Sequence, residues 1–322
     1  MKRGLSILFS SAGRRVELIN CFRNAAERAG IALQVHACDM DPEHSAACRV
    51  ADERFAVPPC LDPFYIPHLL EYCRNQHIDL LVPTIDTELL PIASNRHRFS
   101  AAGTFVHVSD ENVIDVVRDK LTTARVLEAA GVPVPRTACV EDMREKASDW
   151  VWPLFIKPAA GSASRGIFIA QDASALGGPY DEPMIAQELL EGPEYTINMY
   201  IDRLGNLAGA IPHLRMTTRA GEVEKGRTIR DARLIELAER VAAALPGARG
   251  VLCFQAIDDR RRGPLVFEIN ARFGGGYPLA DHAGARFAES LLTLLAHGHE
   301  VATSAWRSEV TMLRYDAAVF NG

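Results

Sequence analysis

Oxygen-bearing side chains gather in two neighbouring predicted strands near the end of the chain. Glu268 and Asn270 are two residues apart in the segment Leu265–Asn270, so both point to the same face of the predicted strand. Gln255 lies in the preceding predicted strand, Gly250–Asp258, and can reach that face. Hard oxygen ligands suit Mg²⁺, which completes its shell with water and nucleotide phosphates. The pattern predicts a magnesium-assisted phosphate site.

A cationic residue and a glycine turn follow this strand. Arg272 comes two residues after Asn270 and projects its guanidinium toward the same charge. Gly275 and Gly276 belong to a run of three glycines after Phe273, where backbone amides can approach an anion. We interpret this turn as part of a substrate site. The alternative is a polar strand end followed by an ordinary glycine turn.

A second segment with phosphate-binding character lies earlier in the chain. Lys157 ends the predicted strand Leu154–Lys157, and a loop of small residues from Gly161 to Gly166 follows it. Glycines let backbone N–H groups approach phosphate oxygens, while Lys157 adds a positive charge. The loop is not a Walker P-loop, because no Gly-Lys-Ser/Thr follows and the next element is not a helix. An ordinary hairpin loop with a surface lysine is the alternative.

The segment from Gln187 to Tyr195 suits the base and the sugar of a nucleotide. Its first residues end a predicted strand, Met184–Glu188, and offer backbone donors and acceptors to a purine edge. The carboxylate of Glu194 is suited to accept hydrogen bonds from ribose hydroxyls. The alternative for these carboxylates is a solvated loop.

Two kinds of scaffold must position these residues. The first third alternates strands with helices, which predicts a parallel sheet with helices on its faces; the expected strands are Leu5–Phe9, Leu33–Cys38, Ile78–Val82 and Thr104–Val108. From Leu154 onward short strands dominate, which indicates an α+β domain; the helices expected in this second part are Glu111–Ala130, Asp231–Leu245 and Leu279–His297. We therefore predict two domains, residues 1–110 and 111–322.

The parallel sheet offers a further candidate site at the carboxyl ends of its strands. Ser11 and Arg14 lie where a strand meets a helix, a position that attracts anions. Asp86 and Glu88 follow another strand and are candidates to hold the ammonium group of a substrate; the alternative is a plain polar loop.

Taken in order and spacing, the motifs resemble those of the ATP-grasp superfamily. They are Asp119-Lys120, Phe155-Ile156-Lys157-Pro158, Gly161–Gly166, Gln187-Glu188-Leu189, Glu194-Tyr195, Gln255 and Glu268-Ile269-Asn270-Ala271-Arg272. The chain is similar to single-module proteins of the carbamoyl-phosphate synthetase large-chain type, and Ile7–Arg15 and Val82–Glu88 fit the α/β domain that precedes the motifs in that family. The resemblance implies a Rossmann-like pre-ATP-grasp domain followed by an ATP-grasp fold whose two lobes clasp ATP.

The resemblance also implies roles for individual residues. The implied ATP-binding residues are Lys120, Lys157, Gly161, Ser162, Ser164, Arg165, Gly166, Gln187, Glu188, Leu189 and Glu194. The lysines would contact phosphates, with Lys157 also near the adenine. Glu188 and Leu189 would form the hinge that binds adenine, and Glu194 would hold the ribose. Mg²⁺ would be bound by Gln255, Glu268 and Asn270, while Arg272 would stabilise the transferring phosphoryl group. Many superfamily members carry a carboxylate in place of Gln255, so this amide should weaken or narrow metal binding.

The implied reaction is phosphorylation of a carboxylate by ATP and attack on the acyl phosphate by an amine. The expected partners are thus a small carboxylate and a small amine. Phosphoryl transfer depends on charge neutralisation, to which Lys157 and Arg272 would contribute. His213, Arg215 and Lys225 are cationic candidates for holding the substrate carboxylate. We predict that residues 219–227 form a loop that closes over the site and excludes water.

Composition narrows the class of protein. With 35 Lys and Arg against 41 Asp and Glu, the net charge is −6, which argues against nucleic-acid binding. No apolar stretch approaches the ~20 residues of a membrane span. The seven cysteines are scattered and contain no C-x-x-C pair, so we expect a reducing compartment and a cytoplasmic protein. A homodimer is the default expectation for assembly.

Two other functions stay open at this stage. The amide of Gln255 supports a second hypothesis, in which the chain is an ATP-binding sensor or partner protein without ligase turnover. A dehydrogenase would have to bind NAD at Gly13 and Asp39, but the G-x-G-x-x-G pattern is absent there. A complete carbamoyl-phosphate synthetase uses two ATP-grasp modules, and this chain carries one set of motifs.

Overall fold

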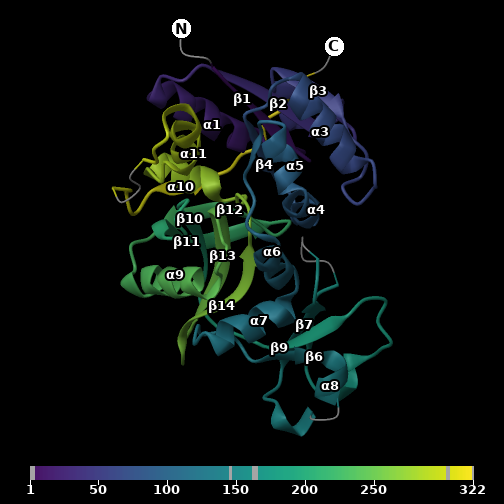
Figure 1. Ribbon diagram of the computed structural model, residues 1–322. Helices are drawn as coiled ribbons and strands as arrows, with labels where there is room; N and C mark the ends of the chain where they lie inside the picture. Colours follow the sequence, from purple (N-terminus) through teal and green to yellow (C-terminus); the bar gives the residue numbers. More distant parts are fainter. Residues whose placement is uncertain (1–3, 145–146, 162–165, 302–304, 321–322) are drawn as a thin grey trace.

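A parallel α/β domain precedes two antiparallel sheets in the computed structural model, which describes residues 4–144, 147–161, 166–301 and 305–320 (Figure 1). This order confirms the predicted fold class. None of the helices among these residues is both long and apolar enough to cross a membrane.

The N-terminal sheet has the strand order β3-β2-β1-β4-β5, and every neighbouring pair is parallel. Its strands are β1 (Leu5–Ser10), β2 (Leu33–Asp39), β3 (Glu53–Ala56), β4 (Leu80–Pro83) and β5 (Phe105–Val106). The carboxyl ends of parallel strands open on one edge of a sheet. The segments that follow β1, β2 and β4 therefore lie on the same edge, as the sequence predicted.

Helices and one 3₁₀ turn connect the strands of this sheet. They are α1 (Val16–Ala29), α2 (Ala46–Val50), α3 (Tyr65–Asn75), the 3₁₀ turn η1 (Asp86–Glu88), α4 (Leu89–Ser94) and α5 (Arg96–Ala101). Of these, α1, α3 and α4 each bury several apolar side chains. In α1 the side chains of Leu18, Ile19 and Phe22 recur at helical spacing and are buried. Gly30, with φ of 64°, ends this helix in the left-handed conformation that glycine adopts most easily.

The first antiparallel sheet forms a small lobe, which we define as residues 137–188 without the undescribed positions. Its order is β6-β9-β7-β8, with strands β6 (Thr137–Cys139), β7 (Leu154–Pro158), β8 (Phe168–Ala170) and β9 (Met184–Glu188). Short helices α8 (Val140–Arg144), η2 (Ala147–Asp149) and η3 (Ala173–Leu176) complete it. In Figure 1 this lobe lies at the end of the molecule far from the two termini.

The second antiparallel sheet, here called the floor sheet, has the order β14-β13-β10-β11-β12-β15. Its strands are β10 (Glu194–Ile201), β11 (Leu207–Arg219), β12 (Glu222–Thr228), β13 (Gly250–Asp259), β14 (Gly263–Asn270) and β15 (Thr311–Leu313). Helix α9 (Ala232–Ala244) packs against it. The expected strands of this region are present, and β11 continues well beyond its predicted end.

The predicted closing loop at residues 219–227 is wrong. These residues belong to a β-hairpin in which β11 and β12 pair through a two-residue turn, and β15 covers the outer edge of β12. Ala220 and Gly221 at the turn have φ values of 50° and 77°, the combination of a type I′ turn that favours tight hairpins. The sequence resembled a loop because the end of this hairpin is largely exposed and so lacks an apolar alternation.

Two predicted long helices are each divided. Residues 111–130 form α6 (Glu111–Arg118) and α7 (Lys120–Ala129), because Asp119 is extended and its carboxylate caps α7 by accepting from Thr122 N at 2.6 Å. Residues 277–297 form α10 (Tyr277–Ala283) and α11 (Phe287–His297), separated by left-handed residues that include Gly284.

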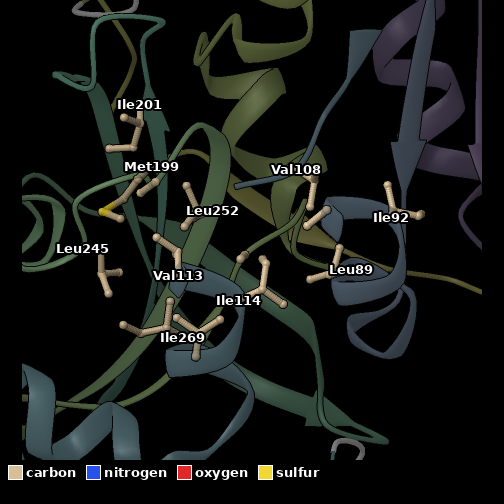
Figure 2. Close-up of a cluster of buried hydrophobic side chains, with 14 of the residues drawn as sticks. Leu89, Ile92, Val108, Val113, Ile114, Met199, Ile201, Leu245, Leu252 and Ile269 are labelled. Atoms are coloured by element: carbon tan, nitrogen blue, oxygen red, sulfur yellow. The ribbon is translucent and has the colours of Figure 1, made fainter. Parts of the chain in front are cut away.

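The floor sheet and the parallel α/β domain share their hydrophobic cores. One core joins α4 to the floor sheet, and Figure 2 shows Leu89 of α4 and Ile114 of α6 in the same cluster as Leu252 of β13. In a second core Phe273, which follows β14, contacts Phe22 of α1 with ring centroids 5.5 Å apart. The small lobe has a separate core around Val140, Leu154, Ile156 and Ala186.

Candidate active site

The register of the floor sheet brings the predicted metal ligands together. Gln255 on β13 is directly opposite Glu268 on β14, and Cys253 is opposite Asn270. Directly opposed residues of an antiparallel pair point to the same face, and so do residues two apart on one strand. Gln255, Glu268 and Asn270 therefore share a single face of the sheet.

The donor set on this face fits Mg²⁺ that is also bound to phosphate. It consists of one carboxylate and two amide oxygens. Within the described ranges no group of three or more His, Cys, Asp or Glu side chains is arranged to hold a metal. Mg²⁺ commonly takes one or two protein carboxylates and completes its shell with water and substrate phosphates. This chain would depend on the nucleotide for the remaining negative oxygens.

Arg272 joins this face to the parallel α/β domain. Its guanidinium donates to Asp86 Oδ2 at 2.7 Å, to Asn270 Oδ1 at 3.2 Å and to the carbonyl of Phe273 at 3.1 Å. Burial acts to lower the pKa of Arg272, but Asp86 raises it above its usual value. The sequence predicted Asp86 as a partner for a substrate ammonium, whereas the structure shows its carboxylate paired with Arg272.

Lys157 reaches toward the floor sheet from β7 of the small lobe. It is 3% exposed, and its Nζ donates to Gln187 Oε1 at 2.9 Å. Its Nζ is also 5.2 Å from the ring centroid of Phe267 on β14. Burial lowers the pKa of Lys157 to about 8, although Glu268 and Glu194 act to raise it. The charges of Lys157, Glu268 and Glu194 therefore influence one another, and Glu268 belongs to the sheet face that carries the predicted metal ligands.

Lys120 and the glycine loop lie at the edge of the small lobe. Lys120 begins α7 and its Nζ donates to the carbonyl of Gly161 at 3.0 Å. Gly161 and Gly166 have φ values of 104° and 67°, which favour glycine. The other predicted members of this loop, Ser162, Ser164 and Arg165, lie outside the described residues.

The predicted adenine hinge lies where β9 leaves the small lobe. The N–H of Glu188 donates to the carbonyl of Arg136 at 3.0 Å, so an adenine contact by Glu188 would fall to its own carbonyl. The Glu188 carboxylate accepts from Arg262 at 2.6 Å, which links the small lobe to the turn between β13 and β14. Leu189 follows directly and is half-buried.

Glu194 and Arg215 are paired with each other. Arg215 Nε lies 2.9 Å from Glu194 Oε1, and its other nitrogens donate to Thr196 Oγ1 at 3.2 Å and to the carbonyl of Gly221 at 2.9 Å. Burial raises the pKa of Glu194, and Arg215 opposes that effect. Arg215 was predicted to anchor the substrate carboxylate. In the structure the Arg215 guanidinium is paired with Glu194, and its contact with a substrate carboxylate stays a prediction.

His213 is not the cation that the sequence predicted. Its side chain is fully buried on β11, and its Nε2 has no hydrogen-bond partner among the residues that the structure describes. Burial lowers the pKa of His213 to about 3, helped by the nearby positive charges of Arg215 and Arg314. It is therefore neutral at physiological pH. A Cβ on Gly276 would lie 2.6 Å from His213 Nε2, so the turn requires glycine at this position.

Glu88 and Ser11 are joined by a hydrogen bond at the edge of the parallel sheet. Glu88 is fully buried and accepts from Ser11 Oγ at 3.0 Å, from Thr84 N at 2.7 Å and from the Tyr65 hydroxyl. Burial raises the pKa of this carboxyl group. Donors from the protein surround its carboxylate, and the ammonium contact to Glu88 stays a prediction.

Several arginines surround a carboxylate beside the glycine turn that the sequence did not predict as part of the site. Glu222, at the start of β12, lies 3.0 Å from Arg15, 3.1 Å from Arg314 and 3.6 Å from the predicted anion-binding residue Arg14. Only the neighbouring pair Arg14 and Arg15 gave a sequence signal, since Glu222 and Arg314 lie far away in the chain. Lys225, a further predicted substrate residue, is exposed on β12.

Comparison with known families matches two segments of the chain. Residues 7–107 match the PylC-like N-terminal domain, and residues 117–276 match the ATP-grasp domain. Together these segments include most of β1, all of β2 to β5 and nearly all of the site described above.

Curated relatives share modest sequence identity with the chain. A D-alanine–D-alanine ligase of Pseudomonas putida (strain GB-1) is 25% identical over 206 residues, which cover 55% of this chain and 63% of that ligase. A D-alanine–D-alanine ligase of Streptococcus uberis is 30% identical over 144 residues, 41% of this chain and 38% of that protein. The chain thus spans less than two thirds of the length of these relatives.

Solved structures share the fold over most of the chain. Biotin carboxylase from Campylobacter jejuni superposes with a TM-score of 0.73 at 16% identity, covering 95% of this chain and 74% of that one. N5-carboxyaminoimidazole ribonucleotide synthetase from Thermotoga maritima gives a TM-score of 0.68 at 18% identity, covering 94% and 78%. The particular likeness to carbamoyl-phosphate synthetase stays a prediction.

Proposed function

We propose that this chain, which belongs to the ATP-grasp superfamily and has a PylC-like N-terminal domain, is a carboxylate–amine ligase that consumes ATP. One observation carries the proposal. Gln255 and Glu268 lie directly opposite each other on the floor sheet, and Arg272 follows the end of β14. The small lobe holds Lys157 close enough to Glu268 for the two charges to interact. An oxygen-rich face opposite a buried lysine is suited to a metal-bound triphosphate.

The relatives support the same class of reaction. The curated relatives named above are described as ligases that join D-alanine to D-alanine, a reaction between a carboxylate and an amine. We extend that reaction class to this chain as part of the proposal. The identities of its own acid and amine are separate questions.

The chemistry would proceed in two steps. A carboxylate oxygen of the acid attacks the γ-phosphorus of ATP, the bond to the β-phosphate oxygen breaks, and ADP leaves with the electron pair. The amine nitrogen then attacks the acyl carbon, inorganic phosphate leaves, and the nitrogen loses a proton. Mg²⁺, when bound, neutralises phosphate charge, and Gln255, Glu268 and Asn270 would hold it.

The protein's own groups would orient this chemistry. Asp86 and Asn270 fix the Arg272 guanidinium, so it can stabilise charge on the transferring group without reorganising. Lys157 would neutralise phosphate charge from the opposite side. We also propose a cytoplasmic location, because all seven cysteines are free.

The test is ADP release from MgATP in the presence of pooled carboxylic acids, with and without pooled amines. We expect a signal that needs both pools and is lost in Lys157→Met and Glu268→Gln. The matched control is Arg23→Gln, which removes the ion pair between Arg23 of α1 and Asp52, a residue that follows α2. ADP release that is equal with and without acid would contradict the ligase.

The composition of the metal face favours one second candidate, an ATP-binding sensor without turnover. Glu268 is the single carboxylate in the proposed ligand set, and a weak metal site would favour binding over phosphoryl transfer. A sensor predicts that MgATP raises the melting temperature while no acid or amine pool releases ADP. A ligase predicts both effects.

A further inference from the structure

Three arginines from two distant parts of the chain converge on a single carboxylate next to the proposed active site. Arg14 and Arg15 follow β1, Arg314 follows β15, and all three face Glu222 at the distances given above. Arg314 also donates to the carbonyl of Gly275 in the glycine turn. The cluster therefore directly adjoins the turn that follows Arg272.

The charges of this cluster do not balance. Arg14, Arg15 and Arg314 contribute three positive charges and Glu222 contributes one negative charge. The neighbouring pair of Arg272 and Asp86 is neutral as a unit. Placing like charges close together in a partly buried site is costly unless an anion compensates them. Burial lowers the pKa of Arg15, and the nearby charge of Arg272 lowers it further.

The geometry already accommodates a carboxylate. Glu222 is ionised at neutral pH because Arg15, Arg14 and Arg314 overcome the effect of burial and lower the pKa of Glu222. A Cβ on Gly275 would lie 2.6 Å from the carboxyl carbon of Glu222, so the turn leaves room for this group only as glycine. The guanidinium groups present five N–H donors each, many more than one carboxylate can use.

We propose that this arginine cluster binds a second anionic group of the acid substrate, in addition to the carboxylate that is phosphorylated. The inference rests on the proposed ligase function. It assigns the acid to the class of dicarboxylates or similar dianions. Arg272 would serve the reacting end, and Arg14, Arg15 and Arg314 would hold the far end.

The cluster is open enough for a ligand to enter. The side chain of Arg14 is 68% exposed, and those of Arg314 and Glu222 are 27% and 23% exposed. Arg15, at 17%, is the least accessible member and forms the inner wall. Guanidinium groups bind carboxylates through paired, charge-assisted hydrogen bonds, which makes them selective for this class of ligand.

The experiment measures binding by calorimetry with a non-hydrolysable ATP analogue and Mg²⁺ present. The probes are dicarboxylates of four to six carbons, each compared with the monocarboxylate of the same length. We expect at least one dicarboxylate to bind about tenfold or more tightly than its monocarboxylate partner, since charged hydrogen bonds are strong. Equal binding of every pair, including no detectable binding of either member, would overturn the inference.

Variants separate this role from a structural one. The double variant Arg14→Gln, Arg314→Gln should remove the preference, while Arg23→Gln should retain it. Glu222→Gln removes the competing carboxylate and should tighten dicarboxylate binding several-fold, an effect that loss of structure would not produce. A preference that persists in the double variant, or weaker dicarboxylate binding in Glu222→Gln, would count against the cluster.

The same titrations distinguish the two proposals. If the ATP analogue itself does not bind, the proposed ligase function fails. If the analogue binds and no dicarboxylate is preferred, the ligase proposal stands and the inference about its acid is overturned.

Discussion

The floor sheet and the small lobe contribute to the same site but are stabilised in different ways. The floor sheet shares two cores with the parallel α/β domain, and Arg272 is fixed by an ion pair with Asp86 from that domain. The small lobe has its own core, and Lys157 is held by Gln187 of the same lobe. The metal and phosphoryl groups would thus be held by a preorganised unit, whereas the lysine belongs to a lobe with a separate core, which we expect to open independently.

The strongest test of this difference is Phe273→Ala. Phe273 is fully buried and contacts the rings of Phe22, His107 and Tyr277, so it bridges the shared core. We expect a loss of about 3–5 kcal/mol in the free energy of unfolding. In urea denaturation the parallel domain and the floor sheet should still unfold in one transition. Two separate transitions for these parts in the wild type would show that their cores are not coupled.

The matched change in the small lobe is Ile156→Ala. Ile156 is fully buried in the separate core, and its loss should cost about 2–5 kcal/mol. We expect this cost to fall on the lobe alone. Hydrogen exchange should accelerate in β7 and β9 while β1, β10 and β13 keep their protection. Equal acceleration in the floor strands would contradict the independence of the lobe.

The charge of Lys157 reports how closely the two regions approach. With a pKa of about 8, this lysine is protonated at pH 7 and mostly neutral at pH 9, so MgATP affinity should fall about tenfold over that interval. The same depressed pKa implies that its contribution to folding stability rises as pH increases above 8, because the unfolded chain then binds more protons.

Two variants check this interpretation. Lys157→Met should bind MgATP weakly and with a flat profile from pH 7 to 9. Glu268→Gln removes a charge that raises the Lys157 pKa, so the fall in affinity should begin at a lower pH. An unchanged midpoint in Glu268→Gln would mean that the floor sheet does not influence the lysine.

The smallest expected effect comes from Arg262→Gln. Arg262 and Glu188 link the lobe to the floor sheet at 2.6 Å, but their side chains are 42% and 34% exposed. Exposed ion pairs contribute roughly 0–1 kcal/mol. The global free energy of unfolding should hardly change, while exchange in β9 should rise by about fivefold or less. A large global loss would show that this link does more than limit lobe opening.

The sequence predicted those parts of the site in which neighbouring residues act together. Strand periodicity placed Glu268 and Asn270 on one face, because that relation is set within a single strand. The partners of Asp86 and Arg215 could not be read in this way, since each pair joins segments that meet only in the folded chain. The predicted positive charge of His213 is wrong for a related reason. Its charge depends on burial, which the surrounding residues determine.

Local backbone conformation explains the errors in the predicted elements. Asp119 interrupts a stretch with continuous helical periodicity, because capping a new helix competes with continuing the old one. The tip of the hairpin, where β11 ends at Arg219 and β12 begins at Glu222, shows no strand pattern in the sequence. Most of its side chains are exposed, so apolar and polar residues do not alternate there. Its turn residues, Ala220 and Gly221, gave only a weak signal because alanine is uncommon at positive φ.

The shared aromatic core has a consequence for how the protein is made. Phe9 and Phe22 emerge from the ribosome early, but the rings that complete their core, Phe273 and Tyr277, are synthesised near the end. Domains that fold during synthesis normally complete their cores in N-to-C order. Here the first domain must wait with an apolar face uncovered until most of the chain has left the ribosome. That interval is when a nascent chain of this protein would most need a chaperone.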